Sequence, residues 1–187
     1  MNKKIDKIKQ QIKKECQRSK TVPTWFFERH LCGVETFARK LLNRLPNANK
    51  EVVLLSVWLH DLQRIRGKKG DHATVGALEA GKVLRKYDYD ADTIQAIKSV
   101  IRSHSCNSNI MPKTVEEKIL ASADAMSHYA NDFYLSIAAL GQRNIEEYKK
   151  WALEKLDRDF NKKIQFAFAR KLIRKRHEII KKFITLG

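Results

Sequence analysis

Apolar side chains recur every three or four residues along most of the chain, which is the spacing found on one face of a helix. The pattern predicts six helices and a helical C-terminal segment, over about residues 2–19, 25–44, 50–59, 72–87, 91–104, 114–141 and 144–185. The third of these is apolar on nearly every side, so we expect it to be the central buried helix. The residues suited to cap helices are Asn49, Asp71, Asp90 and Thr114, the last in a capping box with Glu117.

Composition favours the same fold class. The 187 residues include only seven glycines and three prolines, while Lys, Glu, Leu, Ala and Ile dominate, which is typical of helices. The length is that of one domain, large enough to bury a core without disulfide support. The sequence therefore predicts an all-α fold in a single globular domain.

The positive charge is concentrated at the two ends of the chain. Of the net charge of +17, residues 1–20 carry +6, residues 142–187 carry +8, and residues 21–141 carry only +3. We therefore divide the chain into a basic amphipathic N-terminal helix (1–20), a nearly balanced core (21–141) and basic C-terminal helices (142–187) packed on the same domain. The Lys-rich faces, Lys162 and Lys163 included, can bind a polyanion, steer anionic substrates, or simply keep the protein soluble.

Cysteine usage and hydropathy indicate the compartment. No uninterrupted apolar stretch approaches the roughly 20 residues needed to span a bilayer, and the N-terminus lacks the apolar segment of a signal peptide. Cys16, Cys32 and Cys106 are odd in number and far apart, without the paired spacing of zinc-finger or redox motifs. We expect a cytoplasmic protein with reduced thiols and no membrane partner.

Candidate chemistry lies in the balanced core. The apolar run VVLLSVWL is closed by His60 and Asp61, and burying an unpaired carboxylate costs several kcal/mol unless a cation or donor meets it. Other polar residues at helix ends or core-facing positions are His30, His72, His104 and Asp124. One such histidine is more often a hydrogen-bonded core residue than a ligand. Four histidines and two aspartates so placed favour a site for a borderline divalent metal ion.

The order His30, His60-Asp61, Asp124 resembles the signature of the HD-domain superfamily of metal-dependent phosphohydrolases. The resemblance covers about residues 25–140. The stretches DHATVGA, which begins at Asp71, and IRSHS, which begins at Ile101, are similar to segments of bacterial HD hydrolases acting on nucleotides. The resemblance implies a helical bundle of about seven helices, here with a basic C-terminal helical extension.

The resemblance also implies a set of metal ligands. His30, His60, Asp61 and Asp124 would hold one divalent ion, which can be Mn, Fe, Ni, Co or Mg. In relatives with two ions, an aspartate at the position of Asp61 bridges them. Histidines at the positions of His72 and His104 then complete the second site; with one ion, the same two line the pocket and can hold a phosphate or shuttle a proton. Sequence leaves open whether one or two ions bind.

The implied activity is hydrolysis of a phosphoester or phosphoanhydride in a nucleotide or similar small phosphorylated metabolite. Metal-activated water would attack phosphorus, and the charge that develops needs cationic support. Arg64 is the leading candidate for this support because its planar fork suits a phosphate, although it can equally solvate an exposed loop. Arg102 ranks lower. Asp61, Arg64, His72 and His104 are thus the candidate catalytic residues.

Arg64 is also a departure from one branch of the superfamily. Deoxynucleotide monophosphatases carry a catalytic glutamate at this position, so we do not expect their acid–base mechanism. Acid and base roles would fall on His72, His104 or metal-bound water, with Asp71 and Glu79 as weaker candidates. Among the remaining histidines, we expect His128 to support the ligands and His177 to lie on the surface.

Two other functions are left open by the sequence. Some six-ligand HD relatives are di-iron oxygenases that use dioxygen, and this chain has the same ligand types. A nucleic-acid-binding protein on an HD scaffold would rely on the basic ends and bind with a steep salt dependence. Because the ligand set is intact, we expect a small anionic phosphorylated substrate as partner and rank nucleic acid below it. The oligomeric state is not predicted.

Overall fold

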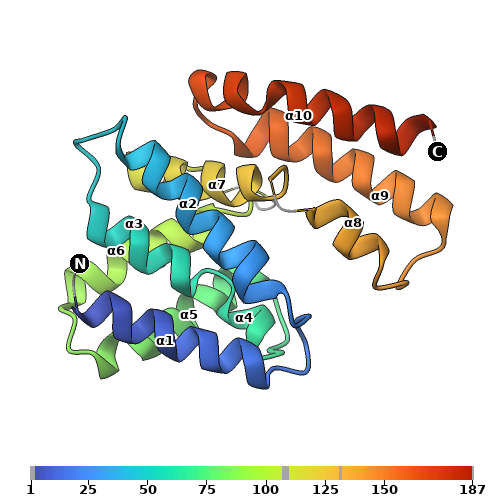
Figure 1. Cartoon of the computed structure of the whole chain (residues 1–187). Helices are drawn as coiled ribbons and strands as arrows, with labels where there is room; N and C mark the ends of the chain where they lie inside the picture. The colour runs from blue at the N-terminus through green and yellow to red at the C-terminus, as the bar shows by residue number, and fades with distance from the viewer. Residues whose placement is uncertain (1–2, 107–109, 131, 187) are drawn as a thin grey trace.

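The computed structural model describes residues 3–106, 110–130 and 132–186. Within these ranges the chain forms ten α-helices, two short π-helical segments and no strand (Figure 1). In chain order they are α1 (Lys3–Arg18), η1 (Phe26–Leu31), α2 (Cys32–Leu42), α3 (Lys50–Leu59), α4 (Leu62–Ile65), α5 (His72–Lys86), α6 (Ala91–Ser103), α7 (Val115–Ser127), α8 (Phe133–Ala138), α9 (Ile145–Arg158), η2 (Asp159–Lys163) and α10 (Ala167–Leu186). The all-α prediction is confirmed, whereas the expected number of about seven helices was too low.

The additional helices arise because three predicted helices are divided and because α4 lies between two predicted helices, where the sequence predicted none. The helix predicted over 25–44 begins as the π-helical η1 and continues as α2. The helix predicted over 114–141 ends at Ser127, and α8 begins only after Asp132, whose φ of 51° is left-handed and cannot continue a right-handed helix. The C-terminal segment is interrupted at residues 164–166, slightly later than the expected break near Asp157–Asp159.

Helix α3 lies at the centre of the core, as predicted. Eight of its ten residues are buried, and it packs against α1, α2, α6 and α7. Trp58 is fully buried; its ring stacks on Phe27 at 5.6 Å, and the ammonium of Lys9 lies 4.5 Å above it. All four predicted caps are observed, each accepting hydrogen bonds from the first turn of its helix.

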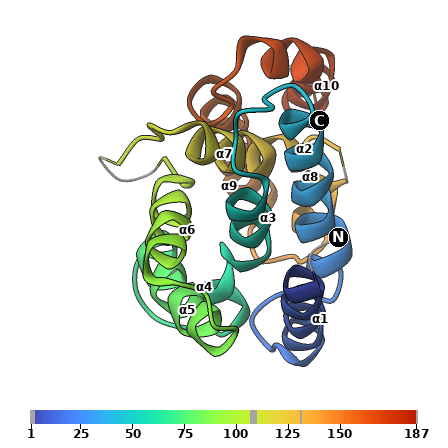
Figure 2. The same cartoon turned by 90° about the vertical axis from the view of Figure 1, so that its left-hand side faces the viewer.

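Helix α1 packs on this core through the predicted apolar stripe. Ile5, Ile8, Ile12 and Cys16 are buried, and burial of each isoleucine contributes about 1.5–3 kcal/mol. At the opposite end of the molecule, α10 lies along α9, and α7 separates this pair from α4 and α5 (Figures 1 and 2). No helix of the described residues is long and apolar enough to cross a membrane.

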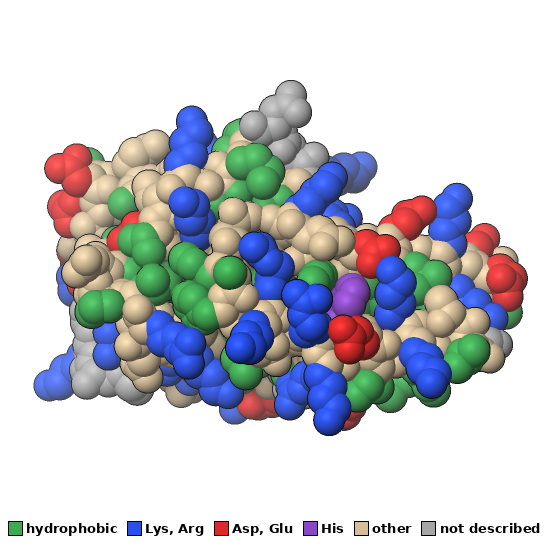
Figure 3. All heavy atoms as spheres, turned by 90° about the horizontal axis from the view of Figure 1, so that it is seen from above, with side chains coloured by type: hydrophobic (Ala, Val, Ile, Leu, Met, Phe, Trp, Pro, Cys, Tyr) green, Lys and Arg blue, Asp and Glu red, His purple; other side chains and the backbone are tan. Residues whose placement is uncertain are grey.

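The C-terminal helices reach α7 through η2. Ser122 of α7 accepts a hydrogen bond from the backbone N–H of Gln165 at 2.9 Å and donates to the carbonyl of Lys163 at 3.4 Å. These two hydrogen bonds hold the end of η2 against α7. The outer face above α10 shows many Lys and Arg side chains interspersed with hydrophobic ones (Figure 3).

Candidate metal centre

His60 and Asp61 form the turn between α3 and α4. The Nδ1 atom of His60 donates to the carbonyl oxygen of Val57 at 2.8 Å, which leaves the Nε2 lone pair facing inward. That Nε2 atom is buried and has no hydrogen-bond partner among the described residues. Helix α5 packs closely on the same turn, because a Cβ at Gly76 would lie 2.7 Å from the carbonyl oxygen of His60. The hydrogen bond to Val57 and the packing of α5 therefore both fix the position of this turn.

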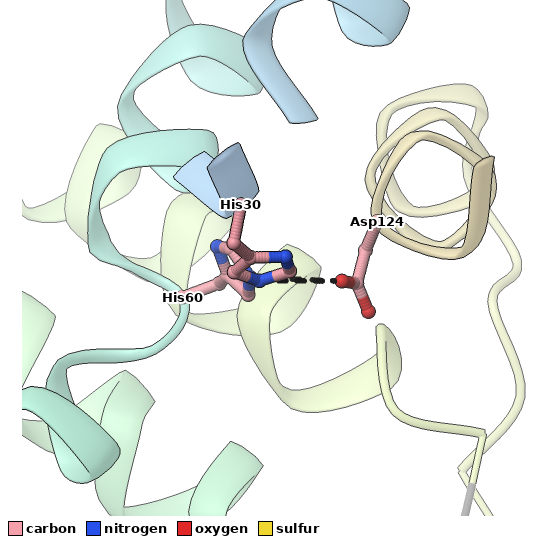
Figure 4. Close-up of side chains that lie close together, drawn as sticks. All are labelled: His30, His60 and Asp124. Atoms are coloured by element: carbon pink, nitrogen blue, oxygen red, sulfur yellow. Dashed lines mark ion pairs between the residues drawn. The ribbon is translucent and has the colours of Figure 1, made fainter. Parts of the chain in front are cut away.

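Four predicted ligands converge on this turn. His30 comes from η1 and Asp124 from α7, and both side chains point toward His60 (Figure 4). His30 Nε2 lies 3.1 Å from Asp61 Oδ2 and 3.6 Å from Asp124 Oδ1. His60 Nε2 lies 3.4 Å and 4.0 Å from the same two oxygens. All four residues are at most 5% exposed. Donor atoms of His30, His60 and Asp124 lie within 4.8 Å of one another, close enough to hold a metal ion, and Asp61 Oδ2 adjoins both imidazoles.

A second group of donors adjoins the first. Donor atoms of His60, Asp61 and His104 also lie within 4.8 Å of one another. The Nδ1 atom of His104 bonds to the carbonyl of Ile101 at 2.5 Å, so its Nε2 atom faces His72 Nε2, 3.3 Å away. His104 is buried, whereas His72 is half-buried. The structure thus brings all six predicted His and Asp residues into one cluster.

Electrostatics prepares this cluster for a cation. Burial by itself would raise the pKa of Asp61 and Asp124, but neighbouring His and cationic side chains outweigh it and hold both pKa values well below the usual range. Burial lowers the pKa of His72, and lowers that of His104 well below its usual value. At neutral pH the cluster therefore presents ionised carboxylates and neutral imidazoles at His72 and His104, the forms in which both bind metals.

The cluster lies at the base of a cavity of about 560 Å³. One wall is aromatic, formed by Trp25, Phe26, Phe133 and Trp151. Six cationic side chains also line it, namely Arg64, Lys68, Arg143, Lys155, Arg158 and Lys163. A donor cluster, cations and an apolar wall together suit an anionic ligand with an apolar portion.

Comparisons with known proteins identify the family of this chain. The family model of the HD domain matches residues 27–128, which is more than half of the chain and includes His30, the His60-Asp61 pair and Asp124. The chain belongs to the HD domain family. This membership confirms the resemblance found in the sequence.

Two kinds of relative are similar to this HD domain protein. The crystal structure of a predicted HD superfamily hydrolase from an uncultured Thermotogales bacterium aligns with a TM-score of 0.64 and 21% identity, over 96% of this chain and 88% of that one. Bifunctional uridylyltransferase/uridylyl-removing enzymes from three strains of Pseudomonas putida are 28% identical over 93 residues, which is 50% of this chain. The matched part spans only 9% of the length of those enzymes.

The other predicted site residues of the HD domain fall into two groups. Arg64 lines the cavity; its Nε lies 3.1 Å from Asp61 Oδ1, and about half of its side chain is exposed. Asp71 caps α5, and Glu79 pairs with Arg66 and Lys82. Like Arg102, neither acid is among the described residues that line the cavity. The weaker acid–base candidates are therefore engaged elsewhere.

Three buried residues that adjoin the ligand cluster were missed or misplaced by sequence reasoning: Lys155, Asp159 and Lys163. Lys163 was expected on the basic surface, yet its ammonium pairs with Asp124 Oδ2, and Asp124 and Asp159 raise its pKa against the effect of burial. Lys155 pairs with Asp159 Oδ2 at 3.0 Å. The spacing of 155, 159 and 163, four residues apart each time, is the sequence signal that could have revealed a shared helix face.

The two remaining histidines differ in position. His128 Nδ1 bonds to Asp159 Oδ2 at 2.8 Å, and its Nε2 lies 3.6 Å from Asp124 Oδ1. Burial lowers the pKa of His128 to about 4. His177, expected on the surface, is instead half-buried and stacks on Phe160 with ring centroids 4.4 Å apart. The mixed apolar and basic pattern of α10 concealed this contact.

Proposed function

We propose that this protein is a metal-dependent phosphohydrolase that cleaves a phosphoester or phosphoanhydride of a nucleotide or a similar small phosphorylated metabolite. The observation that carries the proposal is the buried His60 Nε2, which has no hydrogen-bond partner in the part of the chain that the structure describes. It faces the carboxylates of Asp61 and Asp124 at the base of a cationic cavity. Family membership and the fold of the Thermotogales hydrolase support it. A small anionic substrate is the proposed partner, ahead of nucleic acid.

The proposed ligands of the first ion are His30, His60, Asp61 and Asp124. Their donor atoms fit a divalent ion such as Mn, Fe, Ni, Co or Mg, because two carboxylates offset its charge and imidazoles suit its borderline softness. His72 and His104, with Asp61 shared, would hold a second ion if one binds. A bound ion supplies a water of lowered pKa and draws charge from a phosphoryl oxygen.

The chain's own residues would perform the remaining steps. Arg64 keeps guanidinium donors beyond the Nε that meets Asp61, so it can bind an equatorial phosphoryl oxygen and stabilise the charge that develops there. His72 is half-buried at the cavity wall and faces His104 Nε2, so the pair can carry a proton from the reacting group toward solvent when no second ion occupies their nitrogens. Phe133 and Trp151 would pack on the organic part of the substrate.

Elemental analysis of the purified full chain, paired with a phosphoester screen, tests the proposal. Nucleoside mono-, di- and triphosphates and simple phosphomonoesters are incubated with Mn, Ni, Co or Mg, and released phosphate or pyrophosphate is measured. We expect metal-dependent turnover of at least one class. A bound iron pair with oxygen consumption and no phosphate release would favour a di-iron oxygenase. Tight, salt-dependent nucleic-acid binding without turnover would favour a nucleic-acid-binding protein on an HD scaffold.

The number of ions has its own test. If the site is dinuclear, His72→Ala and His104→Ala each lower the metal stoichiometry from two to one, because each removes a ligand of the second ion only. The matched control is His177→Ala, a histidine remote from the cavity lining. A wild-type stoichiometry near one would reject the second ion.

A further inference from the structure

Three cations of the cavity come from the C-terminal helices. Lys155 and Arg158 lie on α9 and Lys163 ends η2, all beyond residue 128, where the match to the HD domain ends. Lys155 and Lys163 are only 9% and 5% exposed. Lysines so buried need an anionic partner, and each of the two forms an ion pair with a single carboxylate among the residues that the structure describes.

Lys163 is held in a defined position beside the candidate ligands. Its backbone carbonyl accepts from Ser122, and its ammonium donates to Asp124 Oδ2, while Asp124 Oδ1 faces His30 and His60. An ammonium has three donors, and the contact with Asp124 uses one of them. Since Lys163 also lines the cavity, its remaining donors are available to a ligand there.

Lys155 and Arg158 extend this cationic wall. Lys155 donates to Asp159 Oδ2 at 3.0 Å and lies 5.4 Å above the ring of Phe133, between the ligand cluster and the aromatic wall. The Nε atom of Arg158 is buried and has no hydrogen-bond partner among the described residues. The rest of its side chain is partly exposed at the cavity.

The charge balance requires an anion once a metal is bound. The buried charged groups around the cluster are three carboxylates and two ammonium groups, from Asp61, Asp124, Asp159, Lys155 and Lys163. Their net charge is −1, and one divalent cation changes it to +1. Arg64, Lys68, Arg143 and Arg158 at the cavity wall add four more positive charges. A phosphate dianion would offset part of this excess, which an apolar or cationic ligand would leave uncompensated.

We propose that Lys163, together with Lys155 and Arg158, forms a phosphate-binding subsite that the C-terminal helices add to the metal centre. This subsite rests on the proposed function, since its residues would recognise the phosphate of the substrate. Lys163 would donate to a phosphate oxygen while still holding Asp124, which couples phosphate binding to the orientation of that carboxylate. Arg64 would contact the phosphate from the opposite, α4 side of the centre.

Binding of inorganic phosphate to the metal-loaded full chain, measured by calorimetry, tests the subsite without requiring turnover. We expect Lys163→Met and Lys163→Gln to raise the Kd for phosphate at least tenfold, because each removes a charged donor. Lys163→Gln keeps a hydrogen-bond donor for Asp124, and so separates the loss of charge from the loss of that contact. The matched controls are Lys162→Met and Lys162→Gln, at the exposed neighbouring position, which should keep the wild-type Kd. Elemental analysis of every variant accompanies the titrations.

Each outcome is decisive. A wild-type chain that binds metal but no phosphate overturns the subsite, as does an unchanged Kd in both Lys163 variants. If both variants lose the metal, the role of Lys163 is to position Asp124 and not to bind phosphate, which would also overturn the subsite. Phosphate binding that depends on Lys163 in a protein that hydrolyses no phosphoester would instead overturn the proposed function and leave the subsite standing.

Discussion

Asp124 and Lys163, 39 residues apart, form an ion pair in the buried interior at the junction of α7 and η2. One oxygen of Asp124 meets the lysine and the other faces the histidines of the cluster. The carboxylate therefore links the part of the chain matched by the HD domain to the C-terminal helices.

Asp61→Ala should abolish metal retention and hydrolysis while leaving helical content largely in place. The carboxylate lies within 3.4 Å of His30 Nε2 and His60 Nε2 and belongs to the donor group of His60 and His104, so its loss removes a ligand proposed for either ion. Elemental analysis, phosphate release and far-UV circular dichroism measure the three effects. Asp90→Ala is the control: it removes a cap distant from the site, and should cost about 1 kcal/mol of stability with activity retained. Full activity in Asp61→Ala would refute the assigned site.

Arg64→Ala should lower kcat/KM by about 100-fold without changing metal content, because it removes a donor proposed to act on the phosphoryl oxygens. Arg64→Lys should recover only part of the loss, since an ammonium lacks the planar fork. Steady-state kinetics with the best substrate from the screen gives both values. Arg102→Ala, outside the described cavity lining, should match wild type. Equal kinetics in Arg64→Ala and Arg102→Ala would assign Arg64 to loop solvation.

Gly76→Ala should destabilise the protein by about 1–3 kcal/mol and weaken metal binding. The added Cβ would lie 2.7 Å from the carbonyl oxygen of His60, so α5 or the His60-Asp61 turn must shift. Urea denaturation and metal titration report the two effects. At Gly81, on the same helix, an added Cβ would make only ordinary side-chain contacts, the nearest with Cδ of Lys98 at 3.4 Å, so Gly81→Ala should be neutral or stabilising by up to about 1 kcal/mol. Similar behaviour of the two variants would contradict the role of Gly76.

Stability of the metal-free protein should fall as the pH falls from about 6.5 to about 4. Burial lowers the pKa of His128 from 6.5 to about 4, so in this window the unfolded chain binds a proton that the folded chain does not. The contribution is about 3 kcal/mol in total, and His72 and His104 act in the same direction. Urea unfolding in chelator at several pH values measures it. His128→Gln should flatten the slope, and a wild-type free energy of unfolding that is constant over this window would disprove the effect.

Local features of the fold were predictable because they depend on nearby residues. The caps at Asn49 and Asp90 satisfy backbone N–H groups within their own first turns, and the stripe of α1 follows from helical geometry. The division of α7 from α8 was not predicted. It depends on the left-handed backbone at Asp132, a conformation that the continuous apolar pattern there does not signal.

The sequence by itself determined the helical class, the buried α3 and the identity of the His and Asp residues that meet, because periodicity and the cost of an unpaired buried carboxylate act through short-range chemistry. Only the tertiary structure decided where Lys155 and Lys163 lie. Both belong to a Lys-rich segment that is typical of a solvated surface, and their burial follows from the packing of η2 on α7. Ion pairs with Asp159 and Asp124 offset the cost of burying these two ammonium groups, and the sequence pattern does not reveal either pairing.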